Sequence, residues 1–485
     1  MASDKPNIIL ITADQLRFDA VGAAAPVWMR TPHYDDLCRQ GVEFTRAYAD
    51  CAVCVPSRMT IMTGQYGFNH GMLWNGSSSE VLDNSRTLPA LMKDAGYQTC
   101  AVGKMHFTPQ RARHGFDEMW LPDDYYREMH RSGSGVQPMR HGLGQNELYP
   151  GMATVPESMT LTSWTAEKCL EFVRDRRDPT VPFFLWCSFS KPHPPLDPPE
   201  PYYSMYRQCA IPEPVYGDWS EDERCPAACR RFWQSWSLDL TPPEVIREAR
   251  AAYYGLVTQI DYNIGRVLGA LQDVGLLHDA LIVFTSDHGE YLGDHHAGSK
   301  IFFHEPSAHI PLMVRMPASW DRRCYGKRSS ALVTLADVLP TLVTAAGGRT
   351  PDEVDGMDLV ALARGEIEQR PYLEACAHAP SDVAYTAITD GRWKYIYYPE
   401  GPVEQLFDVD EDPHELFDLS GMPQFASRKE ELRAEMVQRG RERGSGYVDE
   451  GGLISRPMQE RPIAEIRTRS WPGYHTDYFD ADVRH

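Results

Sequence analysis

Long apolar runs are absent from this 485-residue sequence. The N-terminus, MASDKPNIILITADQ, has no basic segment, and its apolar run IILIT is far shorter than a signal peptide core or a membrane span. No later stretch is long enough to cross a bilayer as a helix. We therefore expect a protein that is not attached to a membrane.

Positive charge is also scarce, because 48 Lys and Arg residues face 68 Asp and Glu residues, for a net charge of −20. Proteins that bind nucleic acid usually carry a basic stripe, so the balance argues against a nucleic-acid partner. The same charge repels anions. A site for sulfate or phosphate would need its own local cluster of Lys, Arg, His or metal.

The eleven cysteines form no tight framework, and their number is odd. This pattern is typical of reduced thiols in a reducing compartment, and we expect a cytoplasmic protein. Hydrophobic residues make up 42% and aromatic residues 11% of the chain, as in soluble globular proteins. The length allows a large catalytic domain and a smaller second one.

Short apolar runs and an amphipathic helix predict an α/β fold. Ala249, Leu256, Ile260, Val267 and their neighbours recur every three or four residues, which indicates a helix over Pro242–Leu271. Strands alternating with helices over this length predict a doubly wound, mostly parallel sheet. The runs that predict its buried strands are Asn7–Thr12, Gln98–Val102, Pro182–Ser188, Ala280–Thr285 and Pro311–Val314.

The pattern changes near residue 370. Val383–Ile388, Trp393–Tyr398 and Pro402–Asp408 predict short antiparallel strands, and a charged helix follows over Ser427–Arg441. We predict a catalytic α/β domain at 1–370, a smaller α+β domain at 371–445 and a tail at 446–485. The aromatic residues of the tail suggest packing on a partner subunit, which would make a homo-oligomer, or on its own catalytic domain. A floppy terminus is the alternative.

Polar residues follow four of the predicted strands directly. In open α/β sheets, ligands bind beyond the carboxyl ends of the strands, so these side chains predict one active site. In chain order they are Asp14 and Gln15, Lys104 and His106, Lys191 and His193, and Asp287 and His288.

Asp14, Gln15, Asp287 and His288 suit a divalent cation. Carboxylate and amide oxygens favour Ca²⁺ or Mg²⁺, and an imidazole shifts the preference towards Mn²⁺. Taken singly, Asp14 is a common turn residue and His288 an ordinary loop histidine. Taken together, the four residues favour metal binding.

The nearby segment GDHHAGSK adds Asp294, His295, His296 and Lys300. A second metal is conceivable here, but adjacent histidine side chains diverge on most backbones, so His296 fits a surface loop better. Lys300 would bind the oxygens of an anion if its loop folds back over the metal. The alternative is a solvated lysine.

The segment from Cys51 to Arg58, CAVCVPSR, is the most informative. Pro56 and the residues up to Gly64 predict a short helix, which places Cys54 at a helix N-terminus that favours anions. Arg58, one turn on, could reach back to position 54. Cys54 could be a low-pKa nucleophile, half of a redox pair with Cys51, or a buried apolar residue.

Two motifs carry a family resemblance. Cys54-Val-Pro-Ser-Arg58 resembles the C-x-P-S-R signature of type I sulfatases, in the alkaline-phosphatase superfamily. The stretch from Gly96 to His106, GYQTCAVGKMH, resembles their second signature. The likeness extends through SKPHPP, SDHGEYLGDH and LFDVDEDPHEL, up to about residue 440.

The resemblance implies an alkaline-phosphatase-like fold, one divalent cation (Ca²⁺ or Mn²⁺) and oxidation of Cys54 to formylglycine by a formylglycine-generating enzyme. Asp14, Gln15, Asp287 and His288 resemble the metal ligands, which residue 54 completes. The resemblance also implies that Arg58 steadies the formylglycine hydrate and that Lys104, Lys300 and His193 hold a sulfate ester. It implies that His106 acts as the base and His193 as the acid. Asn75 would face the site.

Two departures bear on the substrate. Where this chain has Gln15 and His288, many sulfatases have a second aspartate and an asparagine. In both departures the chain resembles bacterial phosphonate monoester hydrolases, which often use Mn²⁺. Lys104 and His106 follow the sulfatase pattern, and GKMHF resembles choline sulfatases. The resemblance thus implies a sulfate ester hydrolase, with a phosphonate monoester or phosphodiester hydrolase as the alternative.

Overall fold

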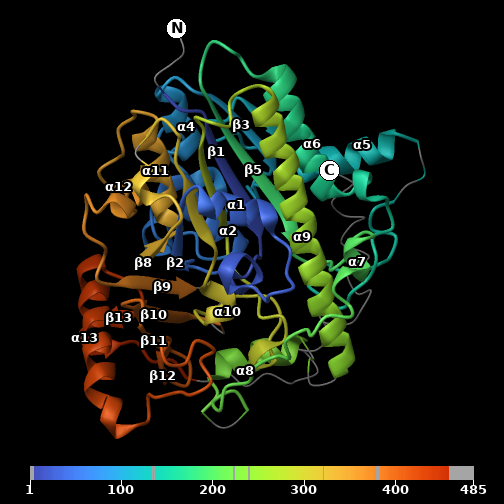
Figure 1. Cartoon of the computed structure of the whole chain (residues 1–485). Helices are drawn as coiled ribbons and strands as arrows, with labels where there is room; N and C mark the ends of the chain where they lie inside the picture. The colour runs from blue at the N-terminus through green and yellow to red at the C-terminus, as the bar shows by residue number, and fades with distance from the viewer. Residues whose placement is uncertain are drawn as a thin grey trace.

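An eight-stranded sheet forms the centre of the computed structural model (Figure 1). The structure describes residues 5–457 except 134, 136, 222–223, 237, 239–240, 321 and 378–382. The strand order is β4-β3-β5-β1-β6-β7-β2-β8. The strands are β1 (Ile8–Asp14), β2 (Val42–Tyr48), β3 (Gln98–Gly103), β4 (Glu118–Trp120), β5 (Phe183–Pro192), β6 (Leu281–Ser286), β7 (Leu312–Arg315) and β8 (Lys327–Thr334).

Helices cover both faces of this sheet, because the central strands are apolar on both faces. On β1, Ile9 and Ile11 pack in one core cluster and Ile8 and Leu10 in another. Figure 1 shows the long helix α9 crossing one face. The helices on that face are α1 (Pro32–Arg39), α6 (Leu161–Glu171) and α9 (Pro243–Asp273), and those on the other are α2 (Cys54–Thr63), α4 (Leu88–Asp94) and α11 (Val338–Ala345). The predicted doubly wound α/β class is confirmed.

The prediction that Pro311–Val314 runs parallel is wrong. β7 is antiparallel to both β6 and β2. The chain between β6 and β7 contains no long crossover helix, only α10 (Glu305–Ala308) and the short η7 (Asp294–His296), and a parallel neighbour needs a longer crossover. A continuous apolar run shows that a strand is buried but does not show its direction.

A separate four-stranded antiparallel sheet, in the order β12-β11-β10-β9, lies at one end of the molecule beside α13 (Figure 1). It comprises β9 (Leu373–Ala377), β10 (Tyr385–Thr389), β11 (Trp393–Tyr398) and β12 (Val403–Asp408). The helix α13 (Ala426–Arg443) packs Leu432 and Met436 against it. Three of the four strands and the following helix are therefore as predicted, whereas β9 was not predicted. The division at residue 370 remains a prediction.

The other described elements are short. Most of the predicted tail, residues 458–485, lies outside the described residues, and so does its predicted role in assembly. In the described part of the chain, no helix is both long and apolar enough for a membrane span. The remaining helices and strands are α3 (Gly67–His70), α5 (Pro122–Arg131), α7 (Tyr202–Met205), α8 (Ala227–Trp236), α12 (Leu359–Arg364), β13 (Val448–Asp449) and β14 (Gly452–Leu453).

Candidate active site

The predicted site residues converge at the carboxyl ends of the central strands. Asp14 ends β1, Lys104 follows β3, His193 follows β5 and Asp287 follows β6. These strands are parallel neighbours, since β1 pairs with β5 and β6, and β5 pairs with β3. Their ends therefore meet at one edge of the sheet, as the sequence predicts.

Position 54 is the first residue of α2, which ends at Gly64 with a left-handed backbone (φ 68°). The preceding Val53 is extended and makes no side-chain cap. Asn75 supplies a partner instead, because its Oδ1 accepts a hydrogen bond from the Val55 N–H at 3.0 Å. The free N–H groups and the dipole of this buried helix end favour an oxyanion at position 54.

Four side chains form a buried cluster that fits a cation. The ligand atoms of Asp14, Cys54, Asp287 and His288 all lie within 4.8 Å of one another. The Cys54 Sγ lies 3.2 Å from His288 Nε2 and 3.8 Å from Asp14 Oδ1. Two carboxylates and an imidazole buried together are stable when a cation or cationic side chains neutralise them. The donor set therefore fits a divalent metal.

Arg58 lies beside the two carboxylates of this cluster. It is 1% exposed, and its guanidinium lies 2.9 Å from Asp287 Oδ2 and 3.9 Å from Asp14 Oδ2. It also donates to the Lys104 carbonyl and, at 2.9 Å, to the Ser188 hydroxyl. Because several acceptors hold this planar group, Arg58 keeps its position in the site.

Two lysines add positive charge. The Lys104 Nζ is hydrogen-bonded to Asp14 Oδ2 and lies 3.9 Å from the Cys54 Sγ. The Lys300 Nζ donates to the Gln15 Oε1 at 2.5 Å, so the Lys300 loop does fold back over the site. Together with Arg58, the two lysines supply the local positive charge that an anionic substrate needs on a chain of net charge −20.

The pKa of the Cys54 thiol is held well below its ordinary value. Burial opposes ionisation of the thiol, but the charges of Lys104, Lys300 and His288 outweigh burial, and His106 adds a hydrogen bond. The residue at position 54 therefore lies where a negative charge is favoured. The surroundings suit an ionised nucleophile or a bound anion.

The two carboxyl groups respond differently. Burial raises the pKa of Asp14, and so does Cys54, but Lys104, His193 and Arg58 hold it well below its usual range. Burial and the Asp14 charge raise the pKa of Asp287. Like charges this close disfavour each other, and a cation between them would remove the conflict.

The two predicted proton-transfer histidines are both at the site. His106 has a left-handed backbone (φ 60°), and its Nδ1 is buried without a hydrogen-bond partner. His193 is bonded through its backbone N–H to the Asp14 carbonyl, and its Nδ1 lies 2.9 Å from the Pro194 carbonyl. Burial and the charges of Lys300 and Lys104 lower the pKa of His193 to about 4.

Several neighbouring polar residues point elsewhere. Lys191 pairs with Asp197 and the Pro195 carbonyl. Asp294 accepts hydrogen bonds from Arg17 and Arg250 rather than from a metal site.

The two histidines of GDHH also diverge. His295 packs on Trp219, whereas His296 stacks on Tyr216 and pairs with Glu221. Within the described residues, the candidate metal cluster contains neither histidine.

The two cysteines of the CAVC segment do not pair. Both are free thiols, and the Cys51 Sγ lies 3.8 Å from the Leu73 carbonyl while Cys54 faces His288. Burial raises the pKa of the Cys51 thiol far above its ordinary value, which is the opposite of a redox-active thiol. The geometry thus does not favour the redox hypothesis.

Glu290 is a buried residue of the site that the sequence did not single out. It is 1% exposed, accepts a hydrogen bond from the Gln15 side chain and receives two more from backbone N–H groups. It lies in the same TSDHGE segment as Asp287 and His288, so its place in the motif was the available signal.

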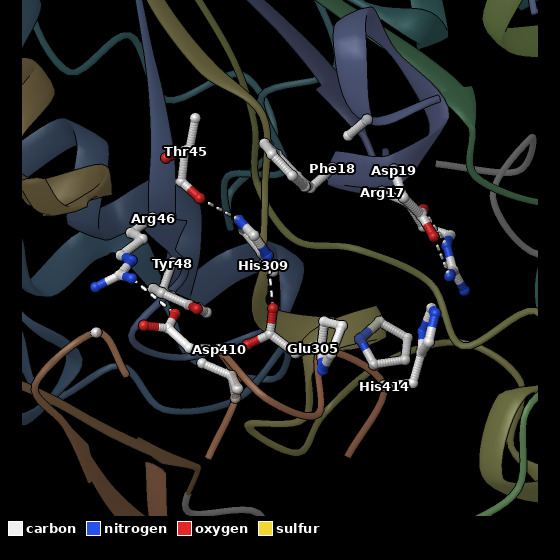
Figure 2. Close-up of a pocket in the computed structure, with 15 residues that line it drawn as sticks. Arg17, Phe18, Asp19, Thr45, Arg46, Tyr48, Glu305, His309, Asp410 and His414 are labelled. Carbon is white, nitrogen blue, oxygen red and sulfur yellow. Dashed lines mark hydrogen bonds and ion pairs between the residues drawn. The ribbon is translucent and has the colours of Figure 1, made fainter. Parts of the chain in front are cut away.

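A separate cavity of about 230 Å³ lies between the turn after β1 and the C-terminal sheet (Figure 2). In its wall, His309 stacks on Phe18 with ring centroids 4.0 Å apart and pairs with Glu305 at 2.6 Å. Arg46 pairs with Asp410 at 2.7 Å, and Figure 2 shows both in the lining. None of the predicted site residues lines this cavity, so it is not the active site.

Comparisons with known proteins agree with this geometry. Residues 6–348 match the family model described as "Sulfatase", and residues 293–442 match "N-sulphoglucosamine sulphohydrolase, C-terminal". An arylsulfatase from Clostridium perfringens (strain 13 / Type A) is 31% identical over 482 residues, covering 93% of this chain and 97% of that protein. A choline-sulfatase from Rhizobium meliloti (strain 1021) is 30% identical over 445 residues, covering 87% and 84%.

Among solved structures, the phosphonate monoester hydrolase of Agrobacterium radiobacter is similar with a TM-score of 0.76. It is 25% identical, and the match covers 94% of this chain and 100% of that one. The fold and the site together define an alkaline-phosphatase-superfamily hydrolase. The chain belongs to the sulfatase family and is a sulfuric ester hydrolase.

Proposed function

We propose that this enzyme hydrolyses sulfate monoesters with a formylglycine hydrate at position 54, beside one divalent cation, Ca²⁺ or Mn²⁺. The convergence of Asp14, Asp287, His288 and residue 54 within 4.8 Å supports this proposal most directly. Gln15 lies beside this cluster, since its backbone N–H donates to Asp287 Oδ1 at 3.0 Å, and its amide oxygen would be a further ligand. The imidazole of His288 shifts the preference towards Mn²⁺.

Two groups would supply chemistry that the side chains lack. The hydrate of a formylglycine offers one hydroxyl as nucleophile and a second on the same carbon, which gives the product an internal route of release. A divalent cation lowers the pKa of a coordinated hydroxyl and balances charge on the sulfate oxygens.

The cationic side chains hold the ester. Lys104 and Lys300 are close enough to position 54 for their charges to lower the pKa of its thiol, and the same charges would stabilise the sulfate oxygens as negative charge develops. Arg58, fixed by Asp287 and Ser188, orients the hydroxyls at position 54. Asn75 holds the start of α2 through Val55.

The two histidines handle protons. The free, buried Nδ1 of His106 is an acceptor for the proton of the remaining hydroxyl. His193 donates to the leaving alcohol when it is protonated. Because its pKa is about 4, it is neutral near pH 7, and the negative charge of an entering ester favours its protonated form.

A comparison of substrates tests the activity. We expect turnover of an aryl sulfate such as 4-nitrophenyl sulfate, with a higher kcat/KM than for the matched aryl phosphonate monoester. The variant Cys54→Ala should lose this activity, because alanine cannot be converted to formylglycine and offers no nucleophilic atom at position 54. Sulfate release by Cys54→Ala at the wild-type rate would refute the proposal.

The second candidate is phosphonate monoester or phosphodiester hydrolysis by the same nucleophile. Gln15 and His288 favour it, as does the similarity to a phosphonate monoester hydrolase at a TM-score of 0.76. A higher kcat/KM for the phosphonate in the same comparison would make this the main activity.

Activity requires that Cys54 is first oxidised to formylglycine. A formylglycine-generating enzyme would oxidise Cys54 before α2 is buried, because Cys54 is 1% exposed in the folded chain. The substrate is a small sulfate ester whose alcohol is aryl, sugar or choline-like. Expression with and without that maturation enzyme should change the activity in proportion to the aldehyde content.

A further inference from the structure

The Gln15 side chain is held between two groups of opposite hydrogen-bonding character. Its Oε1 accepts from the Lys300 Nζ at 2.5 Å, and its Nε2 donates to the Glu290 Oε2. A lysine ammonium only donates, and an ionised glutamate only accepts. The orientation of the Gln15 amide is therefore determined by its two partners.

The orientation matters because the two ends of an amide differ towards a cation. The carbonyl oxygen is a metal ligand, whereas the NH₂ group is a donor and repels a cation. The backbone of Gln15 has φ 71°, and its N–H donates to Asp287 Oδ1 at 3.0 Å, so the residue lies against the metal cluster. Only rotation of the amide decides which end faces Lys300 and the cation.

Backbone hydrogen bonds hold the Glu290 carboxylate in place. Its Oε1 accepts from the Leu292 N–H at 2.8 Å and from the Ser299 N–H at 2.6 Å, which leaves Oε2 for Gln15. Ser299 precedes Lys300, so the same carboxylate fixes the loop that carries the lysine. Glu290 is outside the metal cluster, but its hydrogen bonds position Gln15 and the loop of Lys300 beside that cluster.

We propose that Glu290 is a positioning residue that keeps the Gln15 amide oxygen, rather than its nitrogen, turned towards the cation. This inference rests on the proposed metal-dependent function. Glu290 contacts neither substrate nor metal and acts only through Gln15 and the Ser299–Lys300 loop. Hydrogen-bonded partners of metal ligands commonly contribute 10–100-fold to metal affinity.

The isosteric variant Glu290→Gln tests the inference. The new amide at position 290 must still present its oxygen to the two backbone N–H groups, so its NH₂ faces Gln15. The Gln15 amide would then have a donor on both sides, the Lys300 ammonium and the new NH₂ group, so its orientation would no longer be fixed with the oxygen towards the cation. We expect Mn²⁺ binding, measured by isothermal titration calorimetry, to weaken by ~10–100-fold.

The double variant Gln15→Glu with Glu290→Gln moves the carboxylate from position 290 to position 15 and so keeps the net charge of the pair. The new carboxylate at position 15 would accept from the NH₂ group at position 290 through one oxygen and offer the other to the cation, so Mn²⁺ affinity should recover. The control is Glu374→Gln, because Glu374 is a buried glutamate (4% exposed) on β9 that pairs with Arg443 of α13. Its Mn²⁺ affinity should equal that of the wild type.

Each outcome is informative. Equal Mn²⁺ affinity in the wild type and a folded Glu290→Gln variant would overturn the inference, and so would a double variant that folds but does not recover. If Glu290→Gln fails to fold, recovery in the double variant decides the question. If the wild type binds no Mn²⁺ or Ca²⁺, the proposed metal-dependent function itself fails, which is a distinguishable result.

Discussion

Replacing Lys104 with methionine would remove one positive charge and keep most of the length of the side chain. The Lys104 Nζ lies 3.9 Å from the Cys54 Sγ, where the reacting group is proposed to be. Two unit charges about 4 Å apart interact by about 4 kcal/mol at an effective dielectric constant of about 20. A developing charge of about half a unit gives about 2 kcal/mol.

This difference corresponds to a loss in kcat of about 30-fold, somewhat less than the range of about 10²–10³ seen when one preorganised donor of an oxyanion hole is removed. The binding of Mn²⁺ should not weaken, because Lys104→Met frees an oxygen of Asp14 for the cation. Steady-state kinetics with an aryl sulfate measures the first effect and calorimetry the second. The matched control is Lys93→Met, since Lys93 is on the surface and pairs with Asp117. A kcat within about threefold of the wild type would refute the electrostatic argument.

Three further predictions concern stability and the cation. Burial raises the pKa of Asp50 from 3.8 to about 6, so the folded state binds its proton more tightly and stability falls as pH rises from about 4 to about 6. Urea unfolding should show that Asp50→Asn removes up to about 3 kcal/mol of this fall, and an unchanged pH profile would contradict it. Lys394 is fully buried between Glu305 and Glu415, at 2.7 Å from each, so Lys394→Met should lower the free energy of unfolding by about 3–5 kcal/mol. A loss below about 1 kcal/mol would mean that the two carboxylates are neutral in the fold. Chelation with EDTA should abolish sulfate release, and Mn²⁺ or Ca²⁺ should restore it and raise the melting temperature, with about 2.7 kcal/mol of stabilisation at 100 times the dissociation constant. Full activity after exhaustive chelation would argue against the metal.

The central strands and the site were predictable because both depend on local patterns. β1, β3, β5 and β6 are continuous apolar runs, and the residue after each run is polar. Parallel strands bring those residues to one edge, so Asp14 and Asp287 meet although they are far apart in the sequence. The helix start at Cys54 followed from Pro56 and Gly64 alone.

The outer part of the sheet was not predictable in the same way. β2 and β8 lie near one edge of the sheet, and only some of their residues are buried. Their sequences, VEFTRAY for β2 and KRSSALVT for β8, therefore contain no continuous apolar run that would predict a strand. β7 has the right composition, but its antiparallel direction follows from the connection, not from the strand.

The partners of individual side chains were also not predictable from the sequence. Lys191 and Lys104 both follow a strand directly, yet Lys191 pairs with Asp197 and Lys104 faces Cys54. The role of Glu290 depends on where the loop at Ser299 returns. Partners of this kind come from the folded chain, and local sequence does not encode them.

Mass spectrometry of the tryptic peptide from position 47 to Arg58 tests the central claim most directly. The chemical state of residue 54 decides whether the site contains a formylglycine nucleophile. We predict an aldehyde or its hydrate at position 54, in a fraction that rises with specific activity. A preparation that hydrolyses sulfate esters at full rate while this peptide carries only the cysteine thiol, or a Cys51–Cys54 disulfide, would contradict the account.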